Sequence, residues 1–315
     1  MANLYYIQVT RKCNQRCRFC SNPPNRRWLP LKEGKKLIDY YIRRGCDGII
    51  FTGGEPTLSG YLPDFIRYAN KKGVFQRIIT NGQRLSDYEY LRSLKEAGLY
   101  HLHLSVYSVR ERVQDFLTRN PGSLKNILKA LENLGRIGGI TVDINMVINH
   151  YNADHLLENV VFFDTKFPFI HHYVWNNLDP STTRARRHKD THPTLNEFEL
   201  SLHQAMVYLS ERGKTFRVER IPLCYLGGFE HTSTEARKII KSEDRSTFFL
   251  DDRGILEEKD WLRKWGYSKG KCCKFCFLTS ICPGLFHIDK YYFSREIYPV
   301  YVNKEEIVRK VLYEK

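Results

Sequence analysis

The sequence lacks the features of an exported or membrane-spanning protein. Its first ten residues show no charged-then-apolar pattern of a signal peptide. No uninterrupted apolar run approaches the roughly 18 residues that a membrane span needs. The chain also contains no low-complexity tract and no short-period repeat. We therefore expect a cytoplasmic protein without membrane association.

The nine cysteines are odd in number and unevenly spread. Three fall within residues 13–20 and four within residues 272–282, while Cys46 and Cys224 stand apart. A secreted disulfide scaffold would be shorter and would carry an export signal. In a reducing compartment, grouped cysteines indicate binding of a metal or a cluster.

The composition leaves the partner open. The 315 residues include 42% hydrophobic residues, enough for one large domain or for a large domain with a smaller one. The formal net charge of +15 is compatible with an anionic partner such as nucleic acid, phosphate or an acidic peptide. It is equally compatible with a generally basic surface. No added RNA-binding module is visible, although the charge does not exclude nucleic acid.

Short runs rich in β-branched and aromatic residues alternate with amphipathic stretches. Strands are expected at Leu4–Thr10, Gly48–Thr52, Gln76–Thr80, His101–Val106, Thr141–Ile148 and Ile170–Asn176. Helices are expected near residues 32–44, 61–72, 86–97, 123–137, 153–164 and 195–212. Ser86 and Ser123 are candidate helix starts, and Gly73 and Gly98 are candidate helix stops.

This alternation predicts βαβ units and a parallel sheet. Six units are too few for an eight-stranded barrel, so we expect an α/β fold that is either an open, partial barrel or a doubly wound sheet. In both cases ligands bind at the carboxyl ends of the strands. The alternation stops near residue 213, which predicts a domain at 1–212 and a smaller cysteine-rich one at 213–315.

The first cysteine group follows the first strand directly. Cys13, Cys17 and Cys20 form a C-x3-C-x2-C pattern in a loop at the carboxyl end of that strand. Three thiolates can hold three irons of a cubane cluster and leave the fourth iron open to a small chelating ligand. Structural zinc prefers four protein ligands, and no fourth Cys or His lies nearby in sequence. The neighbouring residues Arg11, Lys12, Arg16 and Arg18 are expected to lower the thiol pKa values.

The second strand ends in Gly53-Gly54-Glu55-Pro56. Two glycines at a strand end allow a close approach of the backbone to a ligand, and the carboxylate of Glu55 can accept hydrogen bonds from an ammonium group. An ordinary Gly-Gly turn is the alternative. It is less apt here because the turn lies one βα unit after the three-cysteine loop, on the same face of the sheet.

Together these two motifs resemble the radical S-adenosylmethionine superfamily. Cys13-x3-Cys17-x2-Cys20, with Phe19 before the last cysteine, is similar to that family's cluster loop, and Gly53-Gly54-Glu55-Pro56 is similar to its site for the methionine amino group. The resemblance covers about residues 4–176. It implies a partial (β/α)6 barrel, a [4Fe–4S] cluster, S-adenosylmethionine as cofactor and an adenine contact near Phe19.

Further positions match the family more loosely. Thr80-Asn81 ends the third strand as in many members, and Ser105 and Asn145 lie where the family often contacts the ribose or the methionine carboxylate. The fourth strand continues Ser-Val-Tyr, whereas Ser-x-Asp is commoner. The alternative for these residues is that they satisfy local backbone groups.

The resemblance also implies a reaction. An electron from the cluster enters the sulfonium, a carbon–sulfur bond breaks, and a 5′-deoxyadenosyl radical takes a hydrogen atom from the substrate. An electron donor such as flavodoxin or ferredoxin is the expected partner. The sequence does not identify a hydrogen donor or acid/base residues beyond the cofactor site.

The second cysteine group resembles part of the auxiliary-cluster extensions called SPASM and twitch domains. Cys273, Cys276 and Cys282 follow a C-x2-C-x5-C pattern, but the further cysteines of the full SPASM pattern are missing. The resemblance implies one auxiliary [4Fe–4S] cluster, with Cys224 as fourth ligand. Cys272 or an open iron is the alternative at that position, and zinc is the alternative to the cluster.

A basic segment after the sixth strand bears on the substrate. The loop after this strand starts at the catalytic face and contains four cationic residues, Arg184, Arg186, Arg187 and Lys189. These residues could bind an anionic substrate, or the loop could simply be solvated. We expect the substrate to be a peptide or protein side chain. The alternatives are a nucleotide or small metabolite, as in the molybdopterin-precursor cyclase, or RNA. A non-enzymatic metal-binding protein would have no use for the Gly53-Gly54-Glu55-Pro56 turn.

Overall fold

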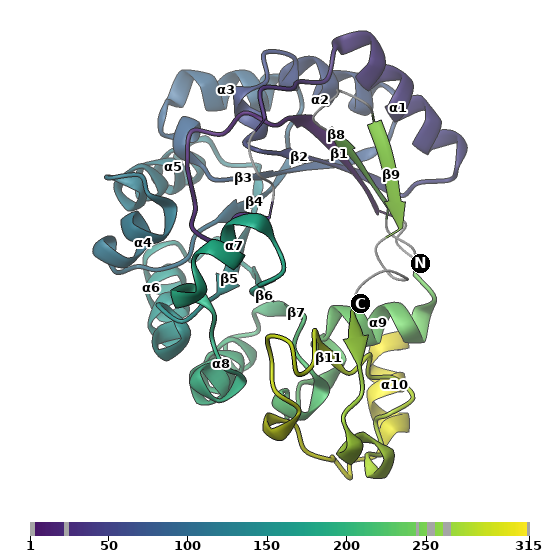
Figure 1. Ribbon diagram of the computed structural model, residues 1–315. Helices are drawn as coiled ribbons and strands as arrows, with labels where there is room; N and C mark the ends of the chain where they lie inside the picture. Colours follow the sequence, from purple (N-terminus) through teal and green to yellow (C-terminus); the bar gives the residue numbers. More distant parts are fainter. Residues whose placement is uncertain (1–3, 22–24, 244–245, 251–255, 261–265, 314–315) are drawn as a thin grey trace.

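The computed structural model describes residues 4–21, 25–243, 246–250, 256–260 and 266–313. Its main element is a nine-stranded sheet in the order β7-β6-β5-β4-β3-β2-β1-β8-β9 (Figure 1). The strands of this sheet are β1 (Leu4–Thr10), β2 (Gly48–Gly53), β3 (Phe75–Thr80), β4 (His101–Ser105), β5 (Thr141–Ile148), β6 (His172–Asn177), β7 (Thr215–Glu219), β8 (Ser246–Leu250) and β9 (Leu256–Asp260).

Ten α-helices are present in the described ranges. They are α1 (Leu31–Arg43), α2 (Leu62–Lys71), α3 (Tyr88–Glu96), α4 (Glu111–Thr118), α5 (Ser123–Ile137), α6 (Leu156–Lys166), α7 (Thr183–Arg187), α8 (Leu195–Glu211), α9 (Thr234–Lys241) and α10 (Lys304–Tyr313). None of the helices in these ranges is both long and apolar enough to cross a bilayer.

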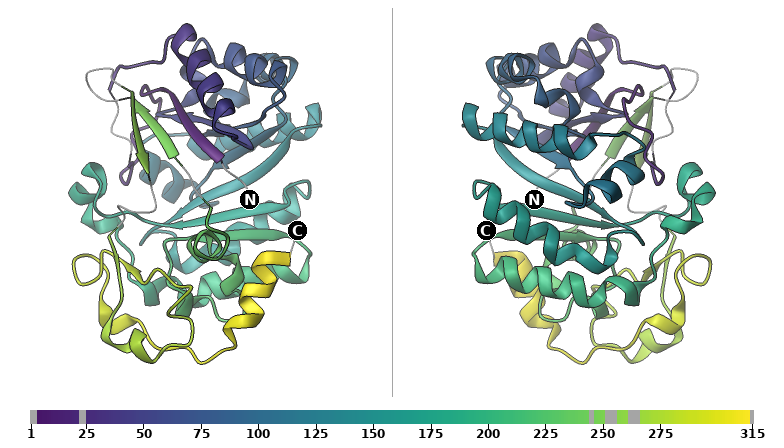
Figure 2. Two further views of the ribbon diagram at one scale, coloured as in Figure 1. Left: turned by 90° about the vertical axis from the view of Figure 1, so that its right-hand side faces the viewer. Right: turned by 90° about the vertical axis from the view of Figure 1, so that its left-hand side faces the viewer.

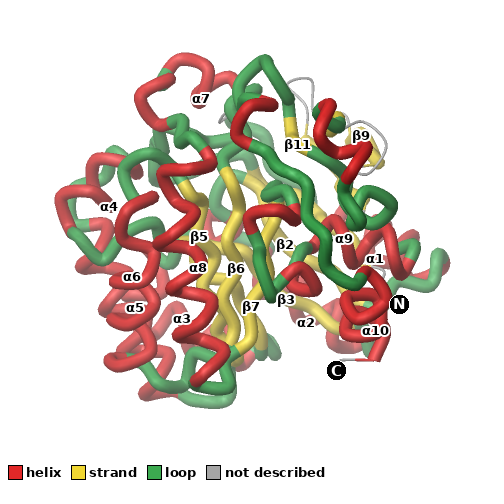
Figure 3. The backbone as a smooth tube through the Cα atoms, turned by 90° about the horizontal axis from the view of Figure 1, so that it is seen from below, coloured by secondary structure: helices red, strands yellow, loops and turns green. Residues whose placement is uncertain are grey.

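The sheet curves into an open barrel. Neighbouring strands from β7 through β1 to β8 are parallel, and only β9 runs antiparallel to its partner, β8. Figure 1 shows the strands as an arc with the helices outside it, and Figure 3 shows α3, α5, α6 and α8 along the outer side of the strands. β7 and β9 end the strand order without pairing to each other, so the barrel is not closed. The expected partial barrel is confirmed, and the doubly wound alternative is wrong.

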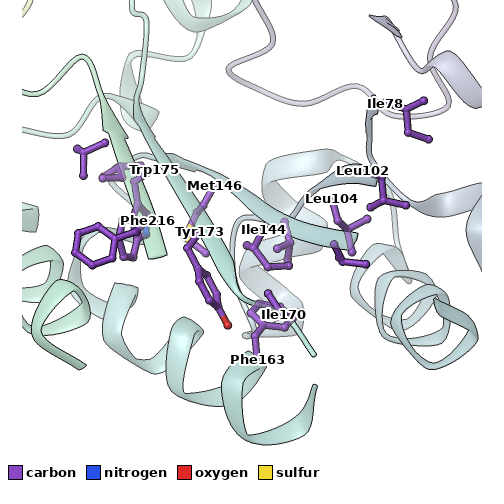
Figure 4. Close-up of a cluster of buried hydrophobic side chains, with 14 of the residues drawn as sticks. Ile78, Leu102, Leu104, Ile144, Met146, Phe163, Ile170, Tyr173, Trp175 and Phe216 are labelled. Atoms are coloured by element: carbon purple, nitrogen blue, oxygen red, sulfur yellow. The ribbon is translucent and has the colours of Figure 1, made fainter. Parts of the chain in front are cut away.

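The two faces of the sheet differ in polarity because successive side chains of a strand point to opposite sides. The outward side chains form the core against the helices, as for Ile144, Met146 and Tyr173 (Figure 4). The inward ones line a cavity inside the barrel, as for Asn145 and His172. The interior of this barrel is therefore a chamber lined by both polar and apolar side chains, and not a second hydrophobic core.

The expected elements agree with the structure, with small shifts at their ends. All six strands and all six helices are present, and Gly73 and Gly98 follow helices α2 and α3 with positive φ angles of 71° and 98°. The expected start of α3 at Ser86 is wrong by one residue: Asp87 caps it and accepts from the backbone N–H groups of Glu89 and Tyr90. The sequence prediction missed α4, which is short.

The sheet continues beyond residue 212, where the sequence predicted a change of domain. β7, β8 and β9 all belong to the same sheet as β1–β6. The remaining part contains α9, α10 and the two-stranded sheet of β10 (Tyr267–Ser268) and β11 (Leu285–Phe286). Figure 2 shows the yellow-green end of the chain on one side of the barrel, where α10 packs against α9.

Candidate active site

The loop after β1 carries the first three cysteines and is held in place from two sides. The backbone N–H groups of Arg16 and Arg18 donate to carbonyl groups at the end of α4, over 3.0 and 2.9 Å. From the other side, Glu55 N–H donates to Lys12 O over 2.7 Å. The N–H of Gln15 points at the Cys13 sulfur, 3.4 Å away. The loop is thus fixed at the carboxyl ends of the strands, where the sequence placed it.

The two glycines after β2 allow this loop to pack closely. A Cβ atom on Gly53 would overlap Thr10 O, and one on Gly54 would overlap Lys12 O. Gly53 also has a φ of 142°, which L side chains rarely adopt. The close approach expected at these glycines is therefore made by the backbone of the cysteine loop.

Glu55 ties the end of β2 to the end of β3. Its side chain is buried, with 1% exposed. Oε1 accepts from the Thr57 and Thr80 hydroxyl groups, each over 2.6 Å, and from Thr57 N–H, while Oε2 accepts from Asn81 N–H over 2.7 Å. Burial raises the pKa of this carboxyl group, and these hydrogen bonds work against that rise. Before any ligand is considered, the carboxylate already has four protein donors.

Thr80 and Asn81 act on the same turn. The Thr80 hydroxyl group donates to the Glu55 carboxylate. The Asn81 side-chain amide donates to Asn14 Oδ1 over 2.8 Å, and its nitrogen lies 3.9 Å from the Cys13 sulfur. Asn81 therefore reaches the cysteine loop, and Thr80 supports Glu55 from behind.

The remaining expected cofactor residues are Phe19, Ser105 and Asn145, of which Asn145 lines the cavity inside the barrel. Phe19 is buried and packs edge-on against Tyr107, with ring centroids 4.8 Å apart. Ser105, at the end of β4, hydrogen-bonds Tyr107, and Asn145 on β5 accepts from the Asn176 amide over 2.8 Å. Tyr107 was not predicted from the sequence. The one feature of the sequence that could have indicated Tyr107 is its position two residues after Ser105, at the carboxyl end of the fourth strand.

The electrostatics of the cysteine loop differ from the expectation. Burial raises the pKa of the Cys13 thiol to about 11 and raises that of Cys17 as well. The cations next to the loop in sequence do not offset this: Arg11 donates to Leu250 O, and Arg18 lies over the Phe116 ring. The expectation that neighbouring cations lower the thiol pKa values is therefore wrong for Arg11 and Arg18.

Arg184 lowers these pKa values instead. It belongs to α7, donates from Nη1 to Cys17 O over 3.3 Å, and acts on the thiols of both Cys13 and Cys17. Arg186 and Arg187 of the same helix are exposed. The basic segment is thus divided between one residue at the cysteine loop and others in solvent.

The second cysteine group surrounds a small pocket next to the barrel. Cys224, Cys273, Cys276 and Cys282 all line it, although about 50 residues separate the first of them from the others. Cys272 does not line it, and its thiol is 3.5 Å from Ile297 O. Burial raises the pKa of Cys224 to about 12. The fold therefore brings together the four thiols that the sequence favoured.

The spacing of the sulfurs fits clusters better than single metal ions. A tetrahedral zinc with Zn–S bonds of about 2.3 Å holds its sulfurs about 3.8 Å apart. Within the described ranges, the one group of three or more potential ligand atoms that all lie within 4.8 Å of each other is His101, His103 and Asp143. No three cysteine sulfurs in these ranges lie that close together. Thiolates are the protein ligands of iron–sulfur clusters, so the donor chemistry of both cysteine groups suits such a cluster.

The barrel encloses a cavity of about 490 Å³. It extends from Ser21, directly after Cys20, past Thr52 and Asn145 to His172 near the start of β6. Sequence analysis missed the charged residues that line it, which are Arg77, His103, Arg217, Glu219, Arg220, Arg237, Lys238 and Glu243. The available signal was the polar side of each alternating strand.

Comparison with known proteins agrees with this geometry. The sequence profile described as the Radical SAM superfamily matches residues 7–163, about half of the chain, which contain the cysteine loop, the glycine turn and strands β1 to β5. The chain belongs to the radical SAM superfamily. It is a radical SAM enzyme, and its cofactors are a [4Fe–4S] cluster and S-adenosylmethionine.

Individual radical SAM proteins resemble parts of the chain. Fe-coproporphyrin III synthase of Methanosarcina barkeri is 36% identical over 46% of this chain and 37% of its own length. GTP 3′,8-cyclase of Aquifex aeolicus is 30% identical over 50% of this chain and 51% of its own length. The chain thus spans about half or less of these curated relatives. The structure of Streptococcus suis SuiB bound to precursor peptide SuiA matches with a TM-score of 0.69 and 16% identity, over 93% of this chain and 75% of that one.

Proposed function

We propose that this radical SAM enzyme abstracts a hydrogen atom from a peptide or protein side chain during maturation of that peptide or protein. The observation that carries the proposal is the chamber inside the barrel. It reaches from the residue after Cys20 into the sheet, so a side chain inserted there meets the cofactor end of the barrel. The strands and the outer helices form the wall of this space on one side, and a radical reaction needs a site from which bulk water is kept away.

We assign the cofactor residues as follows. Cys13, Cys17 and Cys20 hold the cluster, and the iron without a cysteine is open to S-adenosylmethionine. When bound, cluster and cofactor together supply a 5′-deoxyadenosyl radical. Gly53, Gly54 and Glu55 shape the site of the methionine amino group. Phe19 lies at the adenine, and the remaining contacts are Thr80, Asn81, Ser105 and Asn145. Flavodoxin or ferredoxin delivers the electron.

We assign the part of residues 213–315 that lies outside the barrel sheet to an auxiliary-cluster region of the SPASM/twitch kind. Its support is the pocket that Cys224, Cys273, Cys276 and Cys282 share, and the spread of their sulfurs. A peptide substrate is supported by the extent of the likeness to SuiB, which covers the barrel and this region together and whose structure contains a precursor peptide.

A second candidate is a phosphorylated small molecule. Four arginines and a lysine line the chamber, and a GTP cyclase is among the relatives of the amino-terminal half. Such a substrate would occupy the same chamber and react with the same radical. The cavity volume of about 490 Å³ leaves room for either a side chain or a nucleotide-sized molecule.

The test uses anaerobically reconstituted protein, dithionite and S-adenosylmethionine. We expect slow formation of 5′-deoxyadenosine without substrate, and none in the variant in which Cys13, Cys17 and Cys20 are all alanine. Peptides encoded beside the gene, and separately GTP, are then added with S-adenosylmethionine in deuterated water. A mass change in a peptide supports the first candidate, and one in GTP supports the second. No 5′-deoxyadenosine from the fully reconstituted protein would contradict both.

A further inference from the structure

The chamber inside the barrel is rich in cationic side chains. Among the described residues that line it, five are cationic: Arg77, Arg217, Arg220, Arg237 and Lys238. Two are carboxylates, Glu219 and Glu243. Each of the five cations also interacts with other groups of the protein. Even so, a chamber with more arginines than carboxylates attracts a negatively charged molecule, because the low-dielectric protein around it concentrates the field of these charges.

Arg220 lies at the end of the sheet that also carries the cysteine loop. It follows β7, so it lies at the carboxyl end of the sheet, where the cysteine loop and the ends of β1–β6 also lie. Arg77 and Arg217, by contrast, come from the middle of β3 and β7. The side chain of Arg220 lines the chamber. Its Nε–H donates to Asn177 O over 2.7 Å, which fixes the guanidinium against the end of β6.

The backbone of Arg220 is strained. Its φ is 59°, a left-handed conformation that is uncommon for a residue with a long side chain and is found mainly where the surroundings enforce it. Glycine would adopt this conformation without strain. Here an arginine occupies the position, so the side chain offers something that glycine would not.

Hydrogen bonds from several elements hold this conformation. Arg220 N–H donates to Glu235 Oε1, which also accepts from the Tyr267 hydroxyl group over 3.1 Å. On the other side, Asn177 donates from its side-chain amide to Arg220 O and accepts from the Tyr292 hydroxyl group over 3.0 Å. These partners come from β6, α9 and the carboxyl-terminal region, so three parts of the fold hold one arginine at the chamber wall.

We propose that Arg220 binds an anionic group of the substrate, either a carboxylate or a phosphate, and so selects acidic substrates and orients them toward the cofactor. The planar guanidinium suits both groups because it can donate two parallel hydrogen bonds to two oxygens. Arg217 and Lys238 add charge on the same wall. The claim that the bound anion belongs to the substrate rests on the proposed function. The claim that Arg220 binds an anion does not.

The basic residues that the sequence emphasised do not serve this role. Arg184 contacts the cysteine loop, and Arg186 and Arg187 are exposed on α7 and do not line the chamber. This separation provides a matched control, because charge can be removed from α7 without touching the chamber.

The experiment measures binding of two probe anions to the reconstituted protein by isothermal titration calorimetry at low ionic strength. Inorganic tripolyphosphate represents the phosphate source, and hexaglutamate represents the carboxylate source. We expect one of them to bind with a dissociation constant that rises with added salt. Arg220→Gly, which relieves the backbone strain, should weaken that binding at least tenfold. Arg220→Lys should weaken it severalfold, since lysine keeps the charge but loses the paired hydrogen bonds.

The control is the double variant Arg186→Ser and Arg187→Ser, which loses two charges outside the chamber and should bind like the parent. Binding of neither anion to the parent protein would overturn the proposal. The proposal would also be overturned if Arg220→Gly bound the anion as tightly as the parent does. If Arg220→Gly does not fold, Arg220→Lys takes its place, and binding by that variant as tight as that of the parent would overturn the proposal. Cleavage of S-adenosylmethionine without substrate is measured in parallel. If this cleavage does not occur, the proposed function is contradicted but the anion site is not. If cleavage occurs and neither anion binds, the anion site is contradicted but the proposed function is not.

Discussion

The hydroxyl group of Thr80 lies 2.6 Å from the carboxylate of Glu55, so the ends of β3 and β2 are joined by a buried hydrogen bond. The same carboxylate accepts from the next backbone N–H group, that of Asn81. Glu55 therefore shapes the turn that the cysteine loop packs on. If Glu55 binds the cofactor as proposed, its contribution includes this support as well as any contact with the methionine amino group.

Replacing Glu55 should reduce stability as well as cofactor affinity. Glu55→Ala leaves buried donors of Thr80 and Asn81 without their acceptor, which we expect to lower the free energy of unfolding by about 3 kcal/mol. Thr80→Val, the matched control, removes one of these hydrogen bonds and should lower it by about 1–2 kcal/mol. Urea denaturation of the apoprotein measures both. Unchanged stability in Glu55→Ala, with lost affinity for S-adenosylmethionine, would show that the carboxylate serves the ligand alone.

The iron content should distinguish Cys224 from Cys272. The reconstituted parent should contain about eight irons from two cubane clusters, and the triple alanine variant of Cys13, Cys17 and Cys20 about four. Cys224→Ala removes a thiol that lines the second pocket and should lower the content or make the second cluster labile. Cys272→Ala should keep about eight. Zinc in anaerobically purified protein, or an iron loss in Cys272→Ala alone, would contradict the assignment of this site.

Arg184 should raise the reduction potential of the cluster. Its guanidinium lies against Cys17 O, and a nearby cation favours the more negative, reduced state of a cluster. Arg184→Met should therefore shift the midpoint potential downward, by on the order of 50 mV, which corresponds to about 1 kcal/mol for one electron. Arg186→Met is the control because that residue is exposed. Redox titration followed by electron paramagnetic resonance measures the shift; equal potentials would show that Arg184 acts on the backbone only.

Two histidines in the chamber should make stability depend on pH. Burial lowers the pKa of His103 to about 4, helped by Arg77 and opposed by Asp143, and burial also lowers that of His172 to about 4. In the unfolded chain each has a pKa near the ordinary value of about 6.5. Between these values the unfolded chain binds more protons, so the free energy of unfolding falls as the pH falls from 6.5 toward 4.

Each histidine should contribute a loss on the order of 1–2 kcal/mol between pH 7 and pH 5. Urea denaturation of the apoprotein at several pH values measures the slope. The double variant His103→Asn and His172→Asn should show a flatter slope over this interval. A slope that the double variant does not change would place the titrating groups elsewhere.

The sequence was most informative where neighbouring residues carry the signal. The strand Thr141–Ile148 was predicted with its observed ends, because β-branched residues fill it and Gly139 precedes it. The cysteine loop and the glycine turn are equally local, so their position at the carboxyl ends of β1 and β2 could be predicted. The short helix α4 was missed because its eight residues give little periodicity.

Contacts between distant residues could not be predicted in the same way. Arg184 is 167 residues from Cys17, and the strain at Arg220 depends on hydrogen bonds from α9 and from Tyr267. The charged lining of the chamber could not be predicted because alternation within one strand shows only that one of its faces is polar, and not which strands share an interior. Spacing alone could not decide between Cys224 and Cys272.

The place of β8 in the sheet has a consequence for how the protein is made. Leu250 N–H donates to Gln8 Oε1 across 242 residues, and Arg11, next to the cysteine loop, donates to Leu250 O. A ribosome that synthesises about 5–20 residues per second delivers β8 about 12 to 48 seconds after β1. The nascent chain therefore presents its first three cysteines well before the strand that completes the support of their loop.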